Sequence, residues 1–281
     1  IKFRIKTILG LFVQAVTYSI LFDAIFALIN SDSISADSLW NGLLSIPNGQ
    51  WWFITAYFFL YLLSPFLNLP KKYLTKFQFL YLLAVFTLIN FIVGFTLDPS
   101  SLGVLNGYSL FSFICIYFYG QAFNGYLNFN KGRFFYFSLY LICSLLIFSM
   151  YDVCLKYFSV DLAWTAFSYN NPLVMISAVS FFFFFKSFKI SYTGISFFSS
   201  SVLAVYLIHE HPASADFLTD HLNKTATHYM IGNVYFTLFL MAILLFLACT
   251  VVEKLRTALT EPVLNYLIKR YKLDNLDNKL N

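Results

Sequence analysis

The side chains best suited to acid–base chemistry lie in one short stretch of this chain. All four histidines fall between positions 209 and 228, at His209, His211, His221 and His228. The first two flank Glu210 and precede Pro212. An imidazole titrates near neutral pH and can take or give a proton, and a neighbouring carboxylate can assist it. The pattern His209-Glu210-His211 therefore indicates a polar site in which all three residues are candidate catalytic groups.

Two further interpretations of the histidine pair remain open. Residues two apart on a helix point to different faces, so His209 and His211 do not bind one metal ion while helical. A helix break at Pro212 would be needed to turn His211 back, and we expect no metal. The alternative to a chemical site is a structural cap at a membrane interface.

A second ionisable side chain, Asp23, lies inside a long apolar segment. A carboxyl group at that depth must face the protein interior or a water-filled cavity, because exposure to lipid costs several kcal/mol. Asp23 is therefore a fourth candidate catalytic residue. Pairing with a polar neighbour for packing is the alternative.

The elements that position these residues are long apolar segments. Apolar residues make up 59% of the chain and charged residues 11%, far below the charged fraction of a soluble domain. A segment of about 20 apolar residues is long enough to cross a bilayer as a helix. The sequence predicts an all-α polytopic membrane bundle of about eight helices, over residues 7–29, 51–69, 77–97, 107–127, 134–153, 169–185, 197–211 and 230–252.

The charges between these segments predict the topology. Sixteen of the 18 lysines and arginines lie before the first segment, in alternate gaps or in the C-terminal tail. The other two, Lys156 and Lys224, stand among acids. Basic loops stay cytoplasmic. We therefore expect a multi-pass plasma-membrane protein with both chain ends cytoplasmic and with membrane lipid around it. The net charge of +5 is spread over these inner segments, which argues against a nucleic-acid partner.

The predicted domains are a transmembrane domain over 1–252 and a basic amphipathic cytoplasmic tail over 253–281. Asn170 and Asn171 precede Pro172, a pattern typical of a helix start. Two adjacent amides at an outer face could also bind sugar hydroxyls. The four cysteines lack metal-ligand spacing, and no glycine-rich phosphate loop is present.

Two stretches resemble the membrane acyltransferase 3 family, in the branch associated with bacterial capsule and exopolysaccharide synthesis. One runs from Ile46 through Trp51 and Trp52 to Tyr57 and on to Asn68. The other runs from Tyr169 to Ala178 and continues from Ser200 to Pro212. The similarity extends in order from about Arg4 to about residue 255.

The resemblance implies a function. Such proteins are ten-helix transferases that move an acyl group, usually acetyl, from a cytoplasmic acyl-coenzyme A to a sugar hydroxyl. The family histidine lies in the first helix, and the first segment of this chain resembles the third. We therefore expect about two preceding helices to be missing and the chain to be inactive if so.

The resemblance and the predicted topology together assign the remaining candidate residues. The acceptor, a polysaccharide or a lipid-linked glycan, is expected to contact Trp51, Trp52, Tyr57, Asn170 and Asn171. The donor, acetyl-coenzyme A as a substrate, is expected at the basic inner surface, at Arg4, Lys6, Lys71, Lys72, Lys131 and Arg133. The sequence leaves open the sugar, the hydroxyl, the acyl chain and the oligomeric state.

Other functions remain open. One is a non-enzymatic protein of polysaccharide export or assembly, and another is a glycan polymerase or small transporter. A large outer loop with several arginines would favour a polymerase, and no loop of the sequence has that composition.

Overall fold

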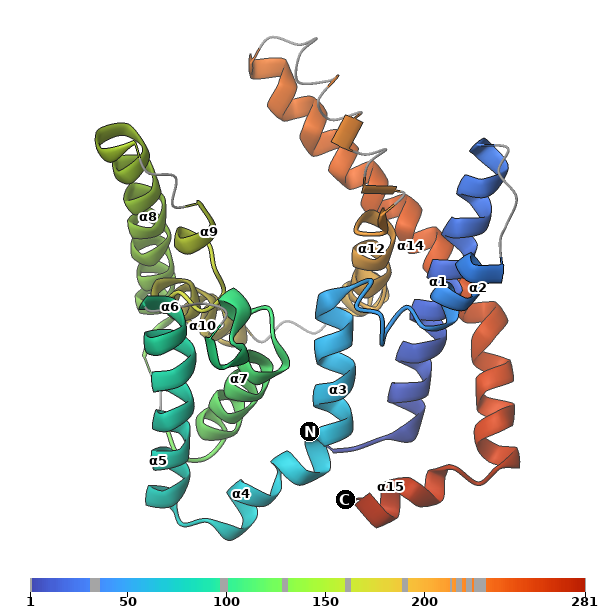
Figure 1. Ribbon diagram of the computed structural model, residues 1–281, viewed down its shortest axis with the longest axis horizontal. Coiled ribbons are helices and arrows are strands. Elements are labelled where there is room, and N and C mark those ends of the chain that lie inside the picture. The colour runs from blue at the N-terminus through green and yellow to red at the C-terminus, as the bar shows by residue number, and fades with distance from the viewer. Residues whose placement is uncertain are drawn as a thin grey trace. The chain divides into compact units, whose positions relative to one another are not determined.

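The computed structural model describes residues 2–30, 36–96, 101–127, 131–159, 163–188, 192–212, 214–215, 219–220, 224 and 231–280 (Figure 1). Across these residues the secondary structure is helical, with no strand. The chain divides into two compact units, one formed by Phe59–Ile190 and the other by Lys2–Phe58 with Ser191–Asn281. Each unit has a buried apolar core of its own.

The unit formed by Lys2–Phe58 and Ser191–Asn281 is built around α1. It contains α1 (Ile5–Asn30), α2 (Ala36–Leu43), the start of α3 (Trp52–Leu67), α11 (Thr193–Ser199), α12 (Val202–His209), α14 (Ile231–Arg270) and α15 (Asp274–Leu280). Helix α1 packs against α2, α12, α14 and α15 (Figure 1). The core of this unit contains Tyr18, Trp51 and Leu207 among other fully buried side chains.

The unit formed by Phe59–Ile190 follows in chain order. It contains the rest of α3, α4 (Leu69–Tyr73), α5 (Lys76–Thr87), η1 (Leu88–Val93), α6 (Gly94–Thr96), η2 (Ser101–Gly103), η3 (Leu105–Gly107), α7 (Leu110–Phe123), α8 (Arg133–Phe158), α9 (Ala163–Ala166) and α10 (Pro172–Lys186). Helices α8 and α10 pack along each other, and α5 packs against α7. Aromatic rings fill these contacts, as in the stacked pair Tyr136 and Phe183.

Local sequence signals explain where several helices begin. The Thr75 hydroxyl accepts from the Gln78 backbone N–H, and the Gln78 side chain accepts from the Thr75 backbone N–H, which makes a capping box for α5. Asn171 caps α10 by accepting from the Leu173 N–H, with Pro172 at the first helical position. The helix start predicted from Asn171 and Pro172 is therefore confirmed.

One local distortion depends on a contact that is distant in sequence. Residues Leu88–Val93 form a π-helical segment after α5, and Asn90 in this segment is buried. The Asn90 side-chain oxygen accepts a 2.6 Å hydrogen bond from the Ser112 hydroxyl of α7. A π-helical turn is the form that α-helices adopt to accommodate one extra residue.

The predicted all-α membrane fold is confirmed. Within the described ranges, five helical spans are long and apolar enough to cross a bilayer: Ile5–Ile25, Trp52–Tyr73, Lys76–Thr96, Arg133–Phe158 and Val234–Arg270. Shorter apolar helices, Leu110–Phe123, Pro172–Lys186 and Gly194–His209, occupy the other three predicted segments. Large apolar side chains such as Phe134 and Phe236 are about 70% exposed (73% and 69%), which suits a lipid environment rather than water.

The end of the last long helix differs from the sequence-based boundary. Helix α14 runs without interruption from Ile231 to Arg270, past the proposed domain boundary at residue 252 and through Pro262. The first part of the predicted tail therefore continues the last apolar segment as one helix, and α15 follows it.

Candidate functional site

A tight turn after α12 separates the two described histidines. Helix α12 ends at His209, and the hydroxyl of Ser214 donates to the carbonyls of Ile208 and His211, the second at 3.1 Å. These bonds satisfy carbonyl groups that the end of a helix leaves open. The chain consequently bends before Pro212, and His211 lies inside the unit.

His211 faces a carboxylate of α1. Its Nε2 lies 3.6 Å from Asp23 Oδ1, and its ring centroid lies 5.4 Å from that of Phe22 and 5.9 Å from that of Trp51. The His211 side chain is 2% exposed, and that of Asp23 is 32% exposed. An imidazole and a carboxylate that are 188 positions apart in the sequence therefore lie side by side, next to two aromatic rings.

The environment of His211 favours its neutral form. Burial among aromatic rings disfavours a charged imidazole, whereas the nearby Asp23 carboxylate favours it. Among the described residues, neither ring nitrogen of His211 has a hydrogen-bond partner, and Trp51 Nε1 also lacks one. The 3.6 Å gap to Asp23 is longer than a hydrogen bond. A neutral imidazole with an uncommitted nitrogen can act as a general base.

His209 and Glu210 lie in a more exposed environment. His209 Nδ1 lies 2.6 Å from the Val205 carbonyl oxygen, one turn back in α12, so this nitrogen carries a proton. Its Nε2 lies 3.3 Å from Glu210 Oε1, and the two side chains are 38% and 54% exposed. His209 and His211 thus point to different environments, as their spacing predicts. His221 and His228 lie outside the described residues.

A polar cavity of about 540 Å³ lies in the same unit, along α1. Its walls include two residues predicted to bind the acyl donor, Arg4 and Lys6, and one predicted to bind the sugar, Tyr57. Arg256 and Thr260 of α14 also line it. The volume is in the usual range for a small-molecule site.

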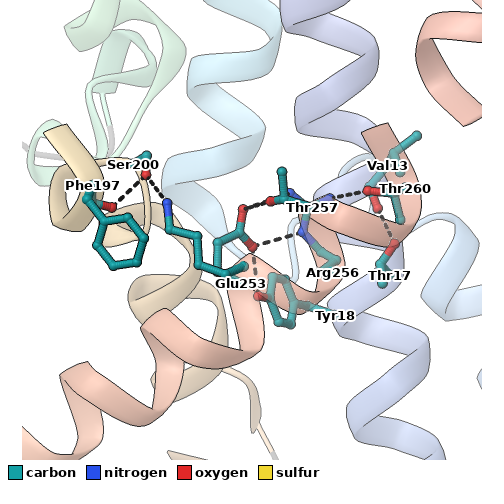
Figure 2. Close-up of polar contacts among 10 residues, drawn as sticks. Val13, Thr17, Tyr18, Phe197, Ser200, Glu253, Arg256, Thr257 and Thr260 are labelled. Atoms are coloured by element: carbon teal, nitrogen blue, oxygen red, sulfur yellow. Dashed lines mark hydrogen bonds and ion pairs between the residues drawn. The ribbon is translucent and has the colours of Figure 1, made fainter. Parts of the chain in front are cut away.

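Arg256 belongs to a buried polar network that joins α14 to α1 (Figure 2). Glu253 accepts 2.8 Å and 2.7 Å bonds from Arg256 Nε and Nη2, and a 2.8 Å bond from the Tyr18 hydroxyl. The side chains of Arg256 and Glu253 are only 13% and 6% exposed. This geometry is the paired arrangement that a carboxylate needs when it leaves water.

The other unit contains a second polar cavity, of about 570 Å³, lined by Lys71 and Lys72 together with Asn68, Tyr117 and Gln121. Lys71 Nζ donates to the carbonyls of Gln121, at 3.2 Å, and of Asn124. Lys71 therefore caps the carbonyl end of α7, as a cation is expected to do. Lys72 lies with its Nζ 5.5 Å from the centroid of the Tyr73 ring.

The remaining candidate residues lie apart from these cavities. Lys131 lines a mostly apolar cavity of about 350 Å³ beside α8 and α10, and Arg133 begins α8 over the Phe134 ring. Asn171 is the α10 cap, and Asn170 is fully buried with no partner for its amide among the described residues. Trp52 lies at the start of α3 with its ring 5.9 Å from Phe53.

The structure thus brings together some of the sequence-predicted residues. His211, Asp23 and Trp51 form one group, and Arg4, Lys6 and Tyr57 line one cavity in the same unit. Lys71, Lys72, Lys131, Arg133, Asn170 and Asn171 belong to the other unit.

Sequence reasoning missed three residues beside the cavity: Tyr18, Glu253 and Arg256. The available signal was an acid and a base three positions apart directly after the last apolar segment, where they resemble the start of a solvated tail.

No group of three or more histidine, cysteine, aspartate or glutamate side chains is arranged for a metal ion among the described residues. The fold and site define a polytopic helical membrane protein with a buried imidazole–carboxylate pair and a basic cavity. A family model described as an acyltransferase domain matches residues 1–253, so the chain belongs to the acyltransferase 3 family. No curated protein and no solved structure matches the chain.

Proposed function

We propose that this membrane acyltransferase moves an acetyl group from acetyl-coenzyme A to a hydroxyl of a cell-surface polysaccharide or its lipid-linked precursor. The family match over residues 1–253 carries this proposal, because it gives acyl transfer as the activity. The proposed location is the plasma membrane, with both chain ends cytoplasmic.

In the proposed mechanism, His211 is the general base. Its neutral ring removes the proton from the acceptor hydroxyl while the hydroxyl oxygen attacks the thioester carbonyl. The carbon–sulfur bond then breaks, and the leaving thiolate takes the proton from the imidazolium. Asp23, 3.6 Å away, stabilises the imidazolium while it exists.

The two substrates have different candidate contacts. Trp51 packs against His211 and is therefore the first candidate to contact the acceptor, and Trp52 and Tyr57 are further proposed contacts in the same unit. Asn170 and Asn171, which belong to the other unit, stay alternative acceptor contacts. Arg4 and Lys6, which line one cavity, are the first candidates for the donor phosphates. Lys71, Lys72, Lys131 and Arg133 stay alternative donor contacts.

The test compares surface polysaccharide from cells carrying the wild-type gene, the deletion, His211→Gln or His209→Gln, with O-acetyl groups counted by NMR. Loss of a general base typically lowers a rate by about 10²–10⁴. We expect His211→Gln to match the deletion, with polymer still made but lacking one acetyl group. His209→Gln is the matched control and should keep most of the acetylation, since His209 bonds to its own helix.

Two results would contradict the proposal. Normal acetylation in His211→Gln would remove His211 from the mechanism while leaving the transferase activity in place. Loss of polymer from the surface of the deletion strain, with the residual polymer fully acetylated, would instead indicate a protein of polysaccharide export or assembly.

A further inference from the structure

The two ends of the cavity along α1 differ in exposure to solvent and in charge. Arg4, Lys6 and Thr7 at the start of α1 are exposed, whereas Leu11 and Gln14, further along the same wall, are buried. Lys6 and Gln14, both in α1, are separated by about 12 Å along the helix axis. The cavity therefore has an open end with two cations and a buried end beside Gln14.

Helix α14 follows the opposite direction along this wall. A Cβ on Gly10 would lie 3.9 Å from Leu264, whereas Tyr18 bonds to Glu253. Helices α1 and α14 are thus antiparallel along this wall, and Arg256 lies toward the buried end of the cavity. Arg256 is consequently the cation of the buried end.

Glu253 removes the net charge of that cation. Two hydrogen bonds join the Arg256 guanidinium to the Glu253 carboxylate, and Tyr18 donates to the same carboxylate (Figure 2). A guanidinium has five N–H donors. The Nε–H of Arg256 donates to Glu253, and the two Nη2 N–H groups donate to Glu253 and Thr257. One Nη1 N–H donates to the Thr260 hydroxyl at 2.9 Å.

Within the described part of the chain, the Arg256 guanidinium thus contacts Glu253, Thr257 and Thr260, and the Tyr18 hydroxyl lies close to it as well. The buried end offers the Arg256 guanidinium together with the Gln14 amide, and both residues line the cavity. Glu261 also lines the cavity and repels an anion that moves inward from Arg4 and Lys6. The buried end thus suits uncharged amide and carbonyl groups.

From this arrangement we propose that Glu253 and Tyr18 hold Arg256 as a charge-neutralised hydrogen-bond donor for the uncharged arm of the acyl donor. This proposal rests on the proposed function. The phosphates then bind at Arg4 and Lys6, and the amide-bearing arm that ends in the thioester lies toward Gln14 and Arg256. The cavity orients the donor by polarity, with its charged part at the open end.

The test measures binding of two probes to the purified full chain in lipid nanodiscs. Coenzyme A has the phosphates and the arm, whereas adenosine 3′,5′-bisphosphate has phosphates but no arm. The variants are Gln14→Leu, the double variant Glu253→Gln/Arg256→Gln, and the double variant Arg4→Gln/Lys6→Gln. The first two change no net charge, and thermal unfolding checks that each variant is folded.

We expect Gln14→Leu and Glu253→Gln/Arg256→Gln to weaken coenzyme A binding about three- to tenfold, the value of about one hydrogen bond. Binding of the bisphosphate should stay within about twofold. Arg4→Gln/Lys6→Gln should weaken both probes and reduce the dependence of binding on salt, because it removes the charges that hold phosphate.

Equal loss of both probes in the Glu253→Gln/Arg256→Gln variant would show that Arg256 binds phosphate, and unchanged binding of both would remove it from the site. Either result overturns this inference and leaves the proposed function intact. If the double variant does not fold, the same comparison of coenzyme A and bisphosphate binding is made with Gln14→Leu, and that result tests the inference. Folded wild-type protein that binds neither probe would overturn the proposed donor as well.

Discussion

At the scale of single residues, the charge state of His211 sets the pH range of the proposed reaction. A general base must be neutral to take a proton, so a protonated His211 ring cannot act. The rate of acetyl transfer should therefore fall on an acid limb, as the pH is lowered and the His211 ring takes up a proton. Initial rates of acetyl transfer by reconstituted protein, measured between pH 4.5 and 8, check this.

The variant Asp23→Asn gives the sign of the electrostatic coupling. The Asp23 carboxylate stabilises the protonated His211 ring, so its removal should move the acid limb to lower pH while reducing the maximal rate. His209→Gln is the matched control and should leave the limb in place. A limb that moves to higher pH in Asp23→Asn would contradict the pairing of the two side chains.

At the scale of elements, the Tyr18, Glu253 and Arg256 contacts join α1 to α14. Glu253→Ala leaves a buried guanidinium without its counter-charge, which typically costs about 3–5 kcal/mol. Unfolding of the purified protein in detergent should show that loss, and Glu253→Gln/Arg256→Gln should recover most of it.

Lys254→Ala is the neighbouring control. Lys254 donates to Ser200 in an exposed contact and lies over the Phe197 ring, so its loss should cost at most about 1 kcal/mol. Equal stability of Glu253→Ala and Lys254→Ala would show that the contact between α1 and α14 does not depend on this network.

The segment before α7 provides a matched pair of glycines. Gly103 and Gly107 both have positive φ, of 70° and 89°, but a Cβ on Gly107 would lie 2.6 Å from Tyr169 Cβ, and one on Gly103 would meet no atom within 4 Å. Gly103→Ala should cost about 1–2 kcal/mol from backbone strain alone. Gly107→Ala should cost a further 1–3 kcal/mol, roughly, from overpacking. Similar losses in detergent unfolding would contradict the close contact at Tyr169.

At the scale of the whole molecule, the topology can be tested on one helix. Helix α8 has 26 residues and is about 39 Å long, with Arg133 at one end and Lys156 near the other. In a background lacking the four native cysteines, Lys156→Cys should react with a membrane-impermeant maleimide in intact cells. Arg133→Cys should react only after permeabilisation, and reaction of both in intact cells would contradict the predicted crossing.

The sequence predicted the helical segments well because a bilayer demands long apolar runs, and each of the eight runs contains an apolar helix. It did not predict that α14 continues to Arg270, because hydropathy falls after residue 252 while helix geometry persists. The π-helical turn that contains Asn90 was also missed, and the Asn90 side chain bonds to Ser112 in another helix, a contact that a single sequence does not reveal.

The candidate site was predicted in its residue types but not in its contacts. A break that turns His211 inward was left open by the sequence, and the structure has it between His209 and Pro212. The depth of Asp23 indicated a carboxylate that faces the interior or a cavity, and Asp23 lies 3.6 Å from His211. That these two side chains meet depends on the packing of α1 against α12, which a single sequence does not reveal.

The bond between Tyr18 and Glu253 has a consequence for biosynthesis. The two residues are 235 positions apart, so at about 5–20 residues per second the ribosome takes roughly 12–47 s to supply the partner. During that interval α1 carries a polar side chain in the bilayer without its eventual acceptor. Helices α5, α7, α8 and α10 are all synthesised meanwhile, so their unit can pack first. The unit that contains His211 is completed last, when α14 inserts.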